Sequence, residues 1–216
     1  MPSENNLVRL VYRFKHNLYI NLTNQCPNLC RFCIKNKWDM KFHDHNLNLA
    51  GKEPTAKQVL TAIADDISKN RFFKELVFCG YGESTLRLQE MVEICTDLKQ
   101  QMAEGKIHNF KIRLNTIGLG SLVAGRDITK DLKGLIDEIN ISLNTADPKQ
   151  WVEIVRPQKK YEELGFEAVL DFIKKSTQTF QSTIVSGVDL EEIDKDELKK
   201  LAESLGAKFY LREFLD

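Results

Sequence analysis

The sequence predicts an α/β fold with parallel strands, best described as an incomplete (β/α)6 barrel of the TIM type. Strand patterns and helix patterns alternate along the chain, and strands joined through helices pair in parallel by right-handed crossovers. The chain has 216 residues, whereas a complete eight-unit barrel needs about 250 residues. A doubly wound open sheet is the alternative. In either fold the ligand site lies at the carboxyl ends of the strands.

Six segments have the apolar runs, or the alternation of apolar and polar residues, that are typical of strands. The expected strands are Leu18–Leu22, Glu75–Cys79, Phe110–Leu114, Glu138–Leu143, Phe180–Val185 and Lys208–Leu211. Because these units begin at residue 18, we expect residues 1–17 to form an N-terminal extension and residues 18–216 to form a single domain.

The segments between the strands repeat their apolar residues with the spacing of one helix face. Thr55 and Gln58 form a capping-box pair before the first helix, and the last helix has Asp194 as its cap and Gly206 as its stop. The expected helix faces lie within Val59–Ile67, Leu88–Leu98, Asp127–Leu135, Phe166–Ile173 and Leu198–Leu205. Residues 35–54 have no clear pattern, and loops of that length are usually functional or mobile.

The composition is that of an ordinary globular chain with balanced charge. Hydrophobic residues make up 42% and charged residues 29%, which excludes disorder and collagen-like structure. Lys and Arg total 31, as do Asp and Glu, so no basic field indicates nucleic acid or a membrane surface as a partner. No apolar run reaches about 18 residues, so we expect no membrane span. Residues 1–6 are polar and include Glu4, so we expect no signal peptide.

Five cysteines are present, and three of them stand close together as Cys26, Cys30 and Cys33. An odd and clustered set does not suit a secreted disulfide framework, so we expect reduced thiols and a cytoplasmic location. The three follow the first expected strand with C-x3-C-x2-C spacing. Inert cysteines are usually buried singly among apolar residues. Three thiols in one polar loop therefore indicate a metal site.

Two metals remain open for this loop. A structural zinc ion takes four closed ligands, and the fourth would have to come from His43, His45 or Cys79. A four-iron cluster normally takes four cysteines. Three cysteines leave one iron open to a small molecule, so the missing fourth ligand favours a reactive cluster over a simple electron carrier.

The cysteine loop resembles the signature of the radical S-adenosylmethionine (radical SAM) superfamily, in which an aromatic residue, here Phe32, precedes the last cysteine. The resemblance implies a 4Fe-4S cluster on the three cysteines, whose open iron holds the amino and carboxylate groups of S-adenosylmethionine (SAM). It further implies an enzyme in which reductive cleavage of SAM yields a 5'-deoxyadenosyl radical that abstracts hydrogen from a substrate. An electron donor such as a flavodoxin or ferredoxin is the implied partner. The catalytic residues and the substrate stay unknown.

The segment after the second expected strand resembles the family's Gly-Gly-Glu motif, which contacts the methionine amino group of SAM. Gly80, Gly82 and Glu83 match it, whereas Tyr81 stands where the first glycine is expected. Small residues let a backbone approach a ligand closely, and a carboxylate complements an ammonium group. The alternative is a tight turn in which Glu83 opens the next helix, a common place for acids.

Polar residues also end the third and fourth expected strands. Asn115, Ser142 and Asn144 can each donate or accept hydrogen bonds, and related proteins use such residues to hold the carboxylate and ribose of SAM. Ordinary polarity of strand ends is the alternative. Ile184 and Val185 stand where the family packs the adenine, although core packing explains this pair better.

Together these features resemble the TatD-associated radical SAM family over about residues 18–213. The family name suggests a functional link to a TatD-type hydrolase and does not identify a reaction. The segments that carry the resemblance are Tyr19–Asn24, the cysteine loop, Gly80–Glu83, Ile141–Asn144 and Val155–Pro157. The rival function is a non-catalytic zinc- or iron-sulfur-binding structural module. The series of motifs at successive strand ends favours the enzyme, because a structural staple needs no Gly-Tyr-Gly-Glu segment at another strand.

The remaining cysteines and histidines have plainer interpretations. Cys95 lies on an apolar helix stripe, where it acts as a small hydrophobic residue. Cys79 ends a strand near the expected site and is more simply a buried strand cysteine than a hydrogen-atom donor. The tract His43-Asp44-His45 invites a metal interpretation, but a short tract of this kind in a loop is usually solvated.

Overall fold

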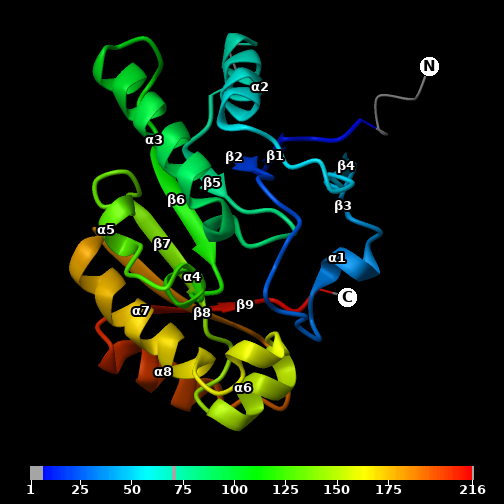
Figure 1. Cartoon of the computed structure of the whole chain (residues 1–216), viewed down its shortest axis with the longest axis vertical. Coiled ribbons are helices and arrows are strands. Elements are labelled where there is room, and N and C mark those ends of the chain that lie inside the picture. The colour runs from blue at the N-terminus through cyan, green and yellow to red at the C-terminus, as the bar shows by residue number, and fades with distance from the viewer. Residues whose placement is uncertain (1–6, 70–71, 216) are drawn as a thin grey trace.

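The computed structural model describes residues 7–69 and 72–215. Its main sheet has seven strands in the order β1-β2-β5-β6-β7-β8-β9 (Figure 1). Every pair of neighbours is parallel except β1 and β2. The order follows the chain without reversal, as it does in a barrel and not in a doubly wound sheet. The predicted α/β fold with a partial barrel is confirmed.

The six expected strands are all present, with ends that shift by a few residues. Strands joined through helices follow one another around the sheet, which brings their carboxyl ends to one side. The strands of the sheet are β1 (Val11–Phe14), β2 (Asn17–Ile20), β5 (Glu75–Phe78), β6 (Lys111–Thr116), β7 (Glu138–Ser142), β8 (Ser182–Val188) and β9 (Lys208–Arg212).

Strand β1 lies within the segment that the sequence analysis assigned to an N-terminal extension. It pairs with β2 as an antiparallel hairpin whose turn contains Lys15 at φ 53°. A positive φ is typical of tight hairpin turns. The Tyr12 hydroxyl donates a hydrogen bond to the backbone oxygen of Cys79 at 2.9 Å. The sheet of the domain therefore begins at residue 11 rather than at residue 18.

The five expected helices are present as α2, α3, α5, α7 and α8. Helix α2 begins with the capping box that Thr55 and Gln58 predict. Helix α6 was not predicted, although Asp147 caps it and Pro148 follows, which is a recognised start signal. The helices are α1 (Ile34–Lys37), α2 (Ala56–Ser68), η2 (Ser84–Arg87), α3 (Leu88–Ala103), α4 (Gly120–Ala124), α5 (Thr129–Leu132), α6 (Pro148–Val155), η3 (Lys159–Tyr161), α7 (Gly165–Thr179) and α8 (Lys195–Ser204).

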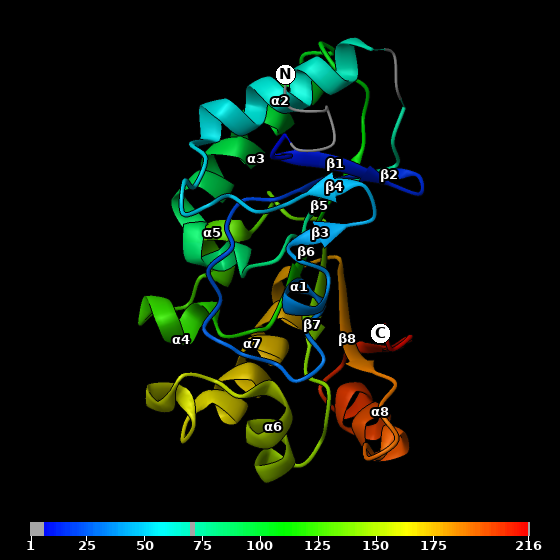
Figure 2. The same cartoon turned by 90° about the vertical axis from the view of Figure 1, so that its right-hand side faces the viewer.

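Helices cover the outer face of the sheet, where the main core lies. Figures 1 and 2 show α3 and α7 on one side of the strands, and α1 with the β3–β4 hairpin on the other. On β6, Ile112 and Leu114 are fully buried among core residues, whereas Arg113 and Asn115 alternate with them. Side chains alternate between the two faces of a strand. On β6 the inner face, which we call the lumen, therefore carries polar side chains.

The patternless segment 35–54 is ordered and contains a small antiparallel hairpin, β3 (Lys41–Phe42) and β4 (His45–Asn46). The Nδ2 atoms of Asn21 and Asn24 both donate to the backbone oxygen of Leu47, at 2.9 and 3.0 Å. His43 stacks on the Phe14 ring, with centroids 5.3 Å apart. His43 and Asp44 are exposed, as expected of a solvated tract, whereas His45 is half-buried with its ring centroid 5.5 Å from that of Tyr12.

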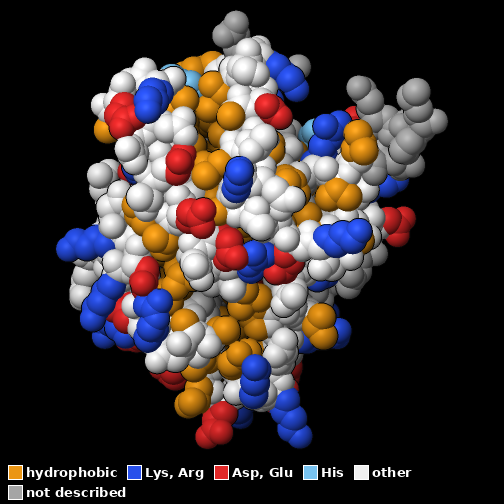
Figure 3. All heavy atoms as spheres, turned by 45° about the horizontal axis from the view of Figure 1, so that its top comes forward, with side chains coloured by type: hydrophobic (Ala, Val, Ile, Leu, Met, Phe, Trp, Pro, Cys, Tyr) orange, Lys and Arg blue, Asp and Glu red, His pale blue; other side chains and the backbone are white. Residues whose placement is uncertain are grey.

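The surface in Figure 3 mixes Lys and Arg with Asp and Glu side chains, in keeping with the net charge of 0. Within the described ranges, no helix is both long enough and apolar enough to cross a membrane. Residues 1–6, on which the expectation about a signal peptide rests, lie outside the described part.

Replacing Leu114 tests how far the sheet depends on its outer-face core. Leu114 on β6 is 0% exposed, whereas Leu164 is 59% exposed. We expect Leu114→Ala to lower the free energy of unfolding by about 2–5 kcal/mol, because it removes buried methyl groups and leaves a cavity. Leu164→Ala is the matched control and should change it by less than about 0.5 kcal/mol. Urea unfolding followed by circular dichroism measures both. Equal effects would contradict this view of the core.

Candidate functional site at the carboxyl ends of the strands

The cysteine loop follows β2 and is anchored to two distant parts of the chain. At its start, the Glu83 N–H donates to the backbone oxygen of Gln25 at 2.8 Å. Further along, the Leu29 N–H donates to Arg156 at 2.9 Å, and the Gln158 N–H donates to Pro27 at 2.8 Å. The backbone of the loop is thereby held by the segments that follow β5 and α6.

Two glycines after β5 allow the first anchor to form. A Cβ atom on Gly82 would lie 2.4 Å from the backbone oxygen of Thr23 and 2.6 Å from that of Gln25. A Cβ atom on Gly80 would lie 2.6 Å from the Asn21 Oδ1 atom. Only glycine fits so close to another backbone. The close approach expected of these glycines is therefore made to the cysteine loop itself, and contact with a cofactor stays a prediction.

The cysteines Cys26, Cys30 and Cys33 are free and half-buried. Burial raises the pKa of the Cys26 thiol to about 12, and the charge of Glu83 adds to the rise. Burial also raises the pKa of Cys30 to about 12, and the charges of Cys26 and Cys33 add to it. The three thiols thus lie near enough to influence one another. Bound metal would have to displace their protons, since thiolate is the ligand form.

The three thiols do not form a ready-made site for a single metal ion in the described residues. Within residues 7–69 and 72–215, no three His, Cys, Asp or Glu side chains are grouped so that they could hold one metal ion. In a four-iron cluster each thiolate binds a different iron, so the thiolates surround the cluster instead of meeting at one point. Of the residues expected as a fourth zinc ligand, His45 has its Nε2 atom 3.1 Å from the backbone oxygen of Arg13, and His43 stacks on the Phe14 ring.

Glu83 is almost fully buried, and its carboxylate is bonded within the protein. Oε1 accepts hydrogen bonds from the Thr85 N–H at 3.1 Å, the Thr85 hydroxyl at 2.6 Å and the Thr116 hydroxyl at 2.8 Å. Oε2 accepts from the Ile117 N–H at 2.8 Å. The carboxylate therefore ties the loop after β5 to the end of β6. It also caps η2, which agrees with the turn alternative.

Burial raises the pKa of Glu83 above its usual value, and the four hydrogen bonds oppose this shift. The four hydrogen-bond donors to the carboxylate are all neutral, so its ionised form depends on neutral groups. These four donors already use most of the acceptor capacity of the Glu83 carboxylate. The contact with an ammonium group that the motif implies for Glu83 remains a prediction.

The polar residues expected at the strand ends come together in the lumen. Ser142 and Asn144 both accept hydrogen bonds from Arg212 Nη2, at 3.2 and 3.3 Å. Asn115 accepts from Arg113 Nη1 at 3.1 Å. Arg212 was not among the expected site residues, because the last strand was predicted to end at Leu211. The alternation places Lys208, Tyr210 and Arg212 on one face of β9, and the register with β7 and β8 shows that this face is the lumen.

The remaining expected site residues divide between the loop, the lumen and the core. Phe32 is half-buried within the cysteine loop. Ile184 lies on the lumen face of β8, in register with Asn140, and is partly exposed. Val185 and Cys95 are fully buried in the core, as the plainer interpretation predicts.

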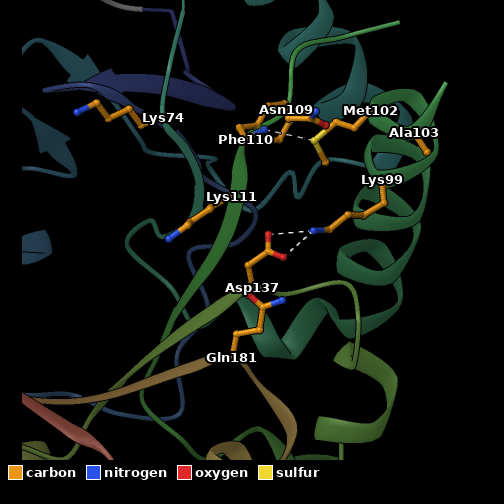
Figure 4. Close-up of a pocket in the computed structure, with 9 residues that line it drawn as sticks. All are labelled: Lys74, Lys99, Met102, Ala103, Asn109, Phe110, Lys111, Asp137 and Gln181. Carbon is orange, nitrogen blue, oxygen red and sulfur yellow. Dashed lines mark hydrogen bonds and ion pairs between the residues drawn. The ribbon is translucent and has the colours of Figure 1, made fainter. Parts of the chain in front are cut away.

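A separate hollow of about 540 Å³ lies away from the thiols, at the amino ends of β6 and β7 (Figure 4). Of the three lysines that line it, Lys99 is paired with Asp137. Lys99 Nζ lies 2.8 Å from Asp137 Oδ1, and Asp137 Oδ2 accepts from the Ile112 N–H at 2.7 Å. No cysteine or histidine lines this hollow, so the chemistry of the thiols belongs to the opposite end of the strands.

Comparisons with known proteins identify the superfamily and the fold. The model of the radical SAM superfamily matches residues 20–205. The fold is similar to that of SuiB from Streptococcus suis, in a crystal structure with the precursor peptide SuiA, with a TM-score of 0.65, 15% identity and coverage of 95% of this chain and 40% of SuiB. SuiB bound to S-adenosylmethionine gives a TM-score of 0.65 at 14% identity, covering 94% of this chain and 41% of SuiB. The chain thus spans about two fifths of SuiB.

The buried carboxylate of Glu83 predicts a pH dependence of stability. A carboxyl whose pKa is raised by folding holds its proton longer in the folded state, so stability falls as pH rises above the unfolded pKa. We expect the difference in unfolding free energy between wild type and Glu83→Gln to shrink from about pH 4 to about pH 7. Urea titrations across this range measure it.

A surface acid provides the control for this measurement. Lys106 lowers the pKa of Glu104 through a side-chain hydrogen bond. The difference in unfolding free energy between wild type and Glu104→Gln should therefore grow with pH, by an amount that solvent screening reduces. If the wild-type advantage over Glu83→Gln grows with pH instead, the four donors outweigh burial at Glu83, and the stated direction is wrong.

Proposed function

This chain belongs to the radical SAM superfamily, and on that premise we propose that it is a radical SAM enzyme whose 4Fe-4S cluster is held by Cys26, Cys30 and Cys33. The observation that carries the proposal is the set of three free, mutually influencing thiols in one loop. When bound, the cluster and SAM supply a 5'-deoxyadenosyl radical that takes a hydrogen atom from the substrate.

In this proposal the chain's own residues position the cysteine loop and bind SAM. Gly82 and the Glu83–Gln25 hydrogen bond fix the start of the cysteine loop, and Arg156 fixes its middle. Asn115, Ser142 and Asn144 offer hydrogen-bonding groups for the ribose and carboxylate of SAM. Phe32 and the backbone of Gly80–Gly82 border the same region.

Glu83 acts in this proposal mainly as a positioning residue. Its carboxylate holds the end of β6 against the loop after β5, and so keeps Asn115 and the cysteine loop in register. Direct contact between Glu83 and the amino group of SAM would use the acceptor capacity that remains on Oε2.

Finer assignments rest on the same motifs. The segments Tyr19–Asn24, Gly80–Glu83 and Val155–Pro157 support membership of the TatD-associated radical SAM family, and with it a functional link to a TatD-type hydrolase. Reduction of the cluster requires an electron donor, such as a flavodoxin or ferredoxin.

Five free cysteines support a reducing, cytoplasmic setting. The precursor peptide SuiA is bound to SuiB in that protein's crystal structure, and the substrate of this chain is not assigned from it.

The rival function, a non-catalytic zinc or cluster module, gains less support. A structural staple explains the three thiols and their anchored loop. It does not explain Ser142, Asn144 and Arg212 gathered on the inner face of the strands.

The ligand set predicts which cysteines are needed for the cluster. Cys26→Ala, Cys30→Ala and Cys33→Ala should each abolish cluster assembly, because each removes one of three protein ligands. Cys95→Ala is the control, since Cys95 is fully buried in the core. Iron and sulfide content per chain after anaerobic reconstitution decides the matter. Full occupancy in any of the three variants would contradict the ligand set, and colourless wild-type protein holding one zinc ion would favour the structural module.

Turnover without substrate tests the enzymatic part of the proposal. Cluster-loaded wild-type protein with SAM and dithionite should release 5'-deoxyadenosine slowly, because substrate often completes such a site and excludes water. Chromatography detects the product. Cys30→Ala should release none, and an equal yield from it would assign the product to contaminating chemistry. Complete absence from fully loaded, reduced wild type over many hours would contradict the radical mechanism.

A further inference from the structure

We propose that Arg212 is an anion-binding residue of the lumen, which, together with Ser142 and Asn144, holds a carboxylate or phosphate group of a bound molecule. The inference deepens the proposed function, because that molecule is either SAM, through its carboxylate, or the substrate. The two sources share one chemistry and are separated by the experiment below.

The register of the sheet places these side chains on one face. Ser142 on β7 pairs with Ser186 on β8, and Ser186 pairs with Tyr210 on β9. Arg212 stands two residues beyond Tyr210 and Asn144 two residues beyond Ser142, so both lie on the same face in the next layer toward the carboxyl ends. The hydrogen bonds from Arg212 Nη2 to Ser142 and Asn144 agree with this placement.

Two arginines face the lumen, and only one of them is neutralised. Arg113 on β6 forms ion pairs with Glu75 at 3.1 Å and with Glu138 at 3.9 Å. Within residues 7–69 and 72–215, Arg212 has no carboxylate partner and contacts neutral oxygens instead. A cation withdrawn from water without a counter-charge is costly. The position of Arg212 therefore suits an anion brought by a ligand.

Unused donors surround this charge. Arg212 Nε is buried and has no hydrogen-bond partner, and the same holds for the Ser186 hydroxyl. A buried polar group without a partner calls for an explanation, such as a bound ion or water. The planar guanidinium matches carboxylate and phosphate oxygens, and the Ser142 hydroxyl can still donate its own hydrogen. One oxyanion would supply both the missing charge and the missing acceptors.

The location ties this anion site to the thiols. Burial lowers the pKa of Arg212, and the charges of Cys79 and Cys30 act in the opposite sense, so the guanidinium lies within the electrostatic influence of both thiols. Cys79 ends β5, and Cys30 belongs to the cysteine loop. An anion on Arg212 would therefore lie inside the lumen beside the proposed cluster.

The first arm of the test uses the full chain without its cluster and malonate as the probe. Malonate should raise the melting temperature of wild type, and Arg212→Gln should weaken its apparent affinity about tenfold or more. Arg212→Lys keeps the charge without the planar fork and should lie between the two. The control is Arg126→Gln, which removes an exposed arginine. This arm does not need a cluster, so it can fail or succeed independently of the proposed function.

The second arm uses the cluster-loaded protein and calorimetry to identify the source of the anion. If SAM supplies it, Arg212→Gln weakens SAM binding about tenfold or more, and decarboxylated SAM binds both proteins equally. If the substrate supplies it, SAM affinity is unchanged and malonate still binds wild type saturated with SAM. Either result supports the proposal.

Three results would overturn the proposal. The first is that wild type binds malonate in neither arm, and the second is that Arg126→Gln loses as much malonate affinity as Arg212→Gln. The third is that Arg212→Gln keeps its affinities for malonate and SAM while its cluster potential shifts. The last result would mean that Arg212 serves the cluster and not a ligand. If Arg212→Gln does not fold, Arg212→Lys and Ser142→Ala decide the question by the same measurements.

Discussion

The candidate site depends on the backbone contact between the loop after β5 and the start of the cysteine loop. Gly82 lies so close to the carbonyl oxygens of Thr23 and Gln25 that no side chain fits between them. The adjoining Glu83 N–H bonds to Gln25, and the Glu83 carboxylate reaches on to Thr116 and Ile117. Three successive strands thus have their carboxyl ends fixed through one short segment, and the position of the thiols over the lumen follows from it.

Periodicity was enough to predict the six parallel strands and five of the helices that connect them, because each buries one face against the other, but it missed α6. It could not predict β1, an edge strand with no helical crossover and little apolar alternation. It also left residues 35–54 without structure, since this segment is held by the side chains of Asn21 and Asn24 rather than by its own pattern. Order of this kind comes from contacts between distant residues.

The cysteine loop was recognisable because its spacing is local. The environment of Glu83 was not, because its hydrogen-bond partners come partly from β6, more than thirty residues further along the chain. Arg212 was missed for a related reason. An arginine at the end of a strand usually reaches solvent, and only the register with β7 and β8 shows that this one turns toward Ser142 and Asn144.

The anchoring of the cysteine loop bears on the order in which the protein is made and loaded. In small zinc domains the metal drives folding, because no site exists before it binds. Here backbone hydrogen bonds to Glu83 and Arg156 hold the loop, and an extensive core supports the segments that supply them. Under the proposed function, iron and sulfide would therefore be delivered to a loop whose backbone is already held at its start and in its middle, so that loading costs little chain entropy.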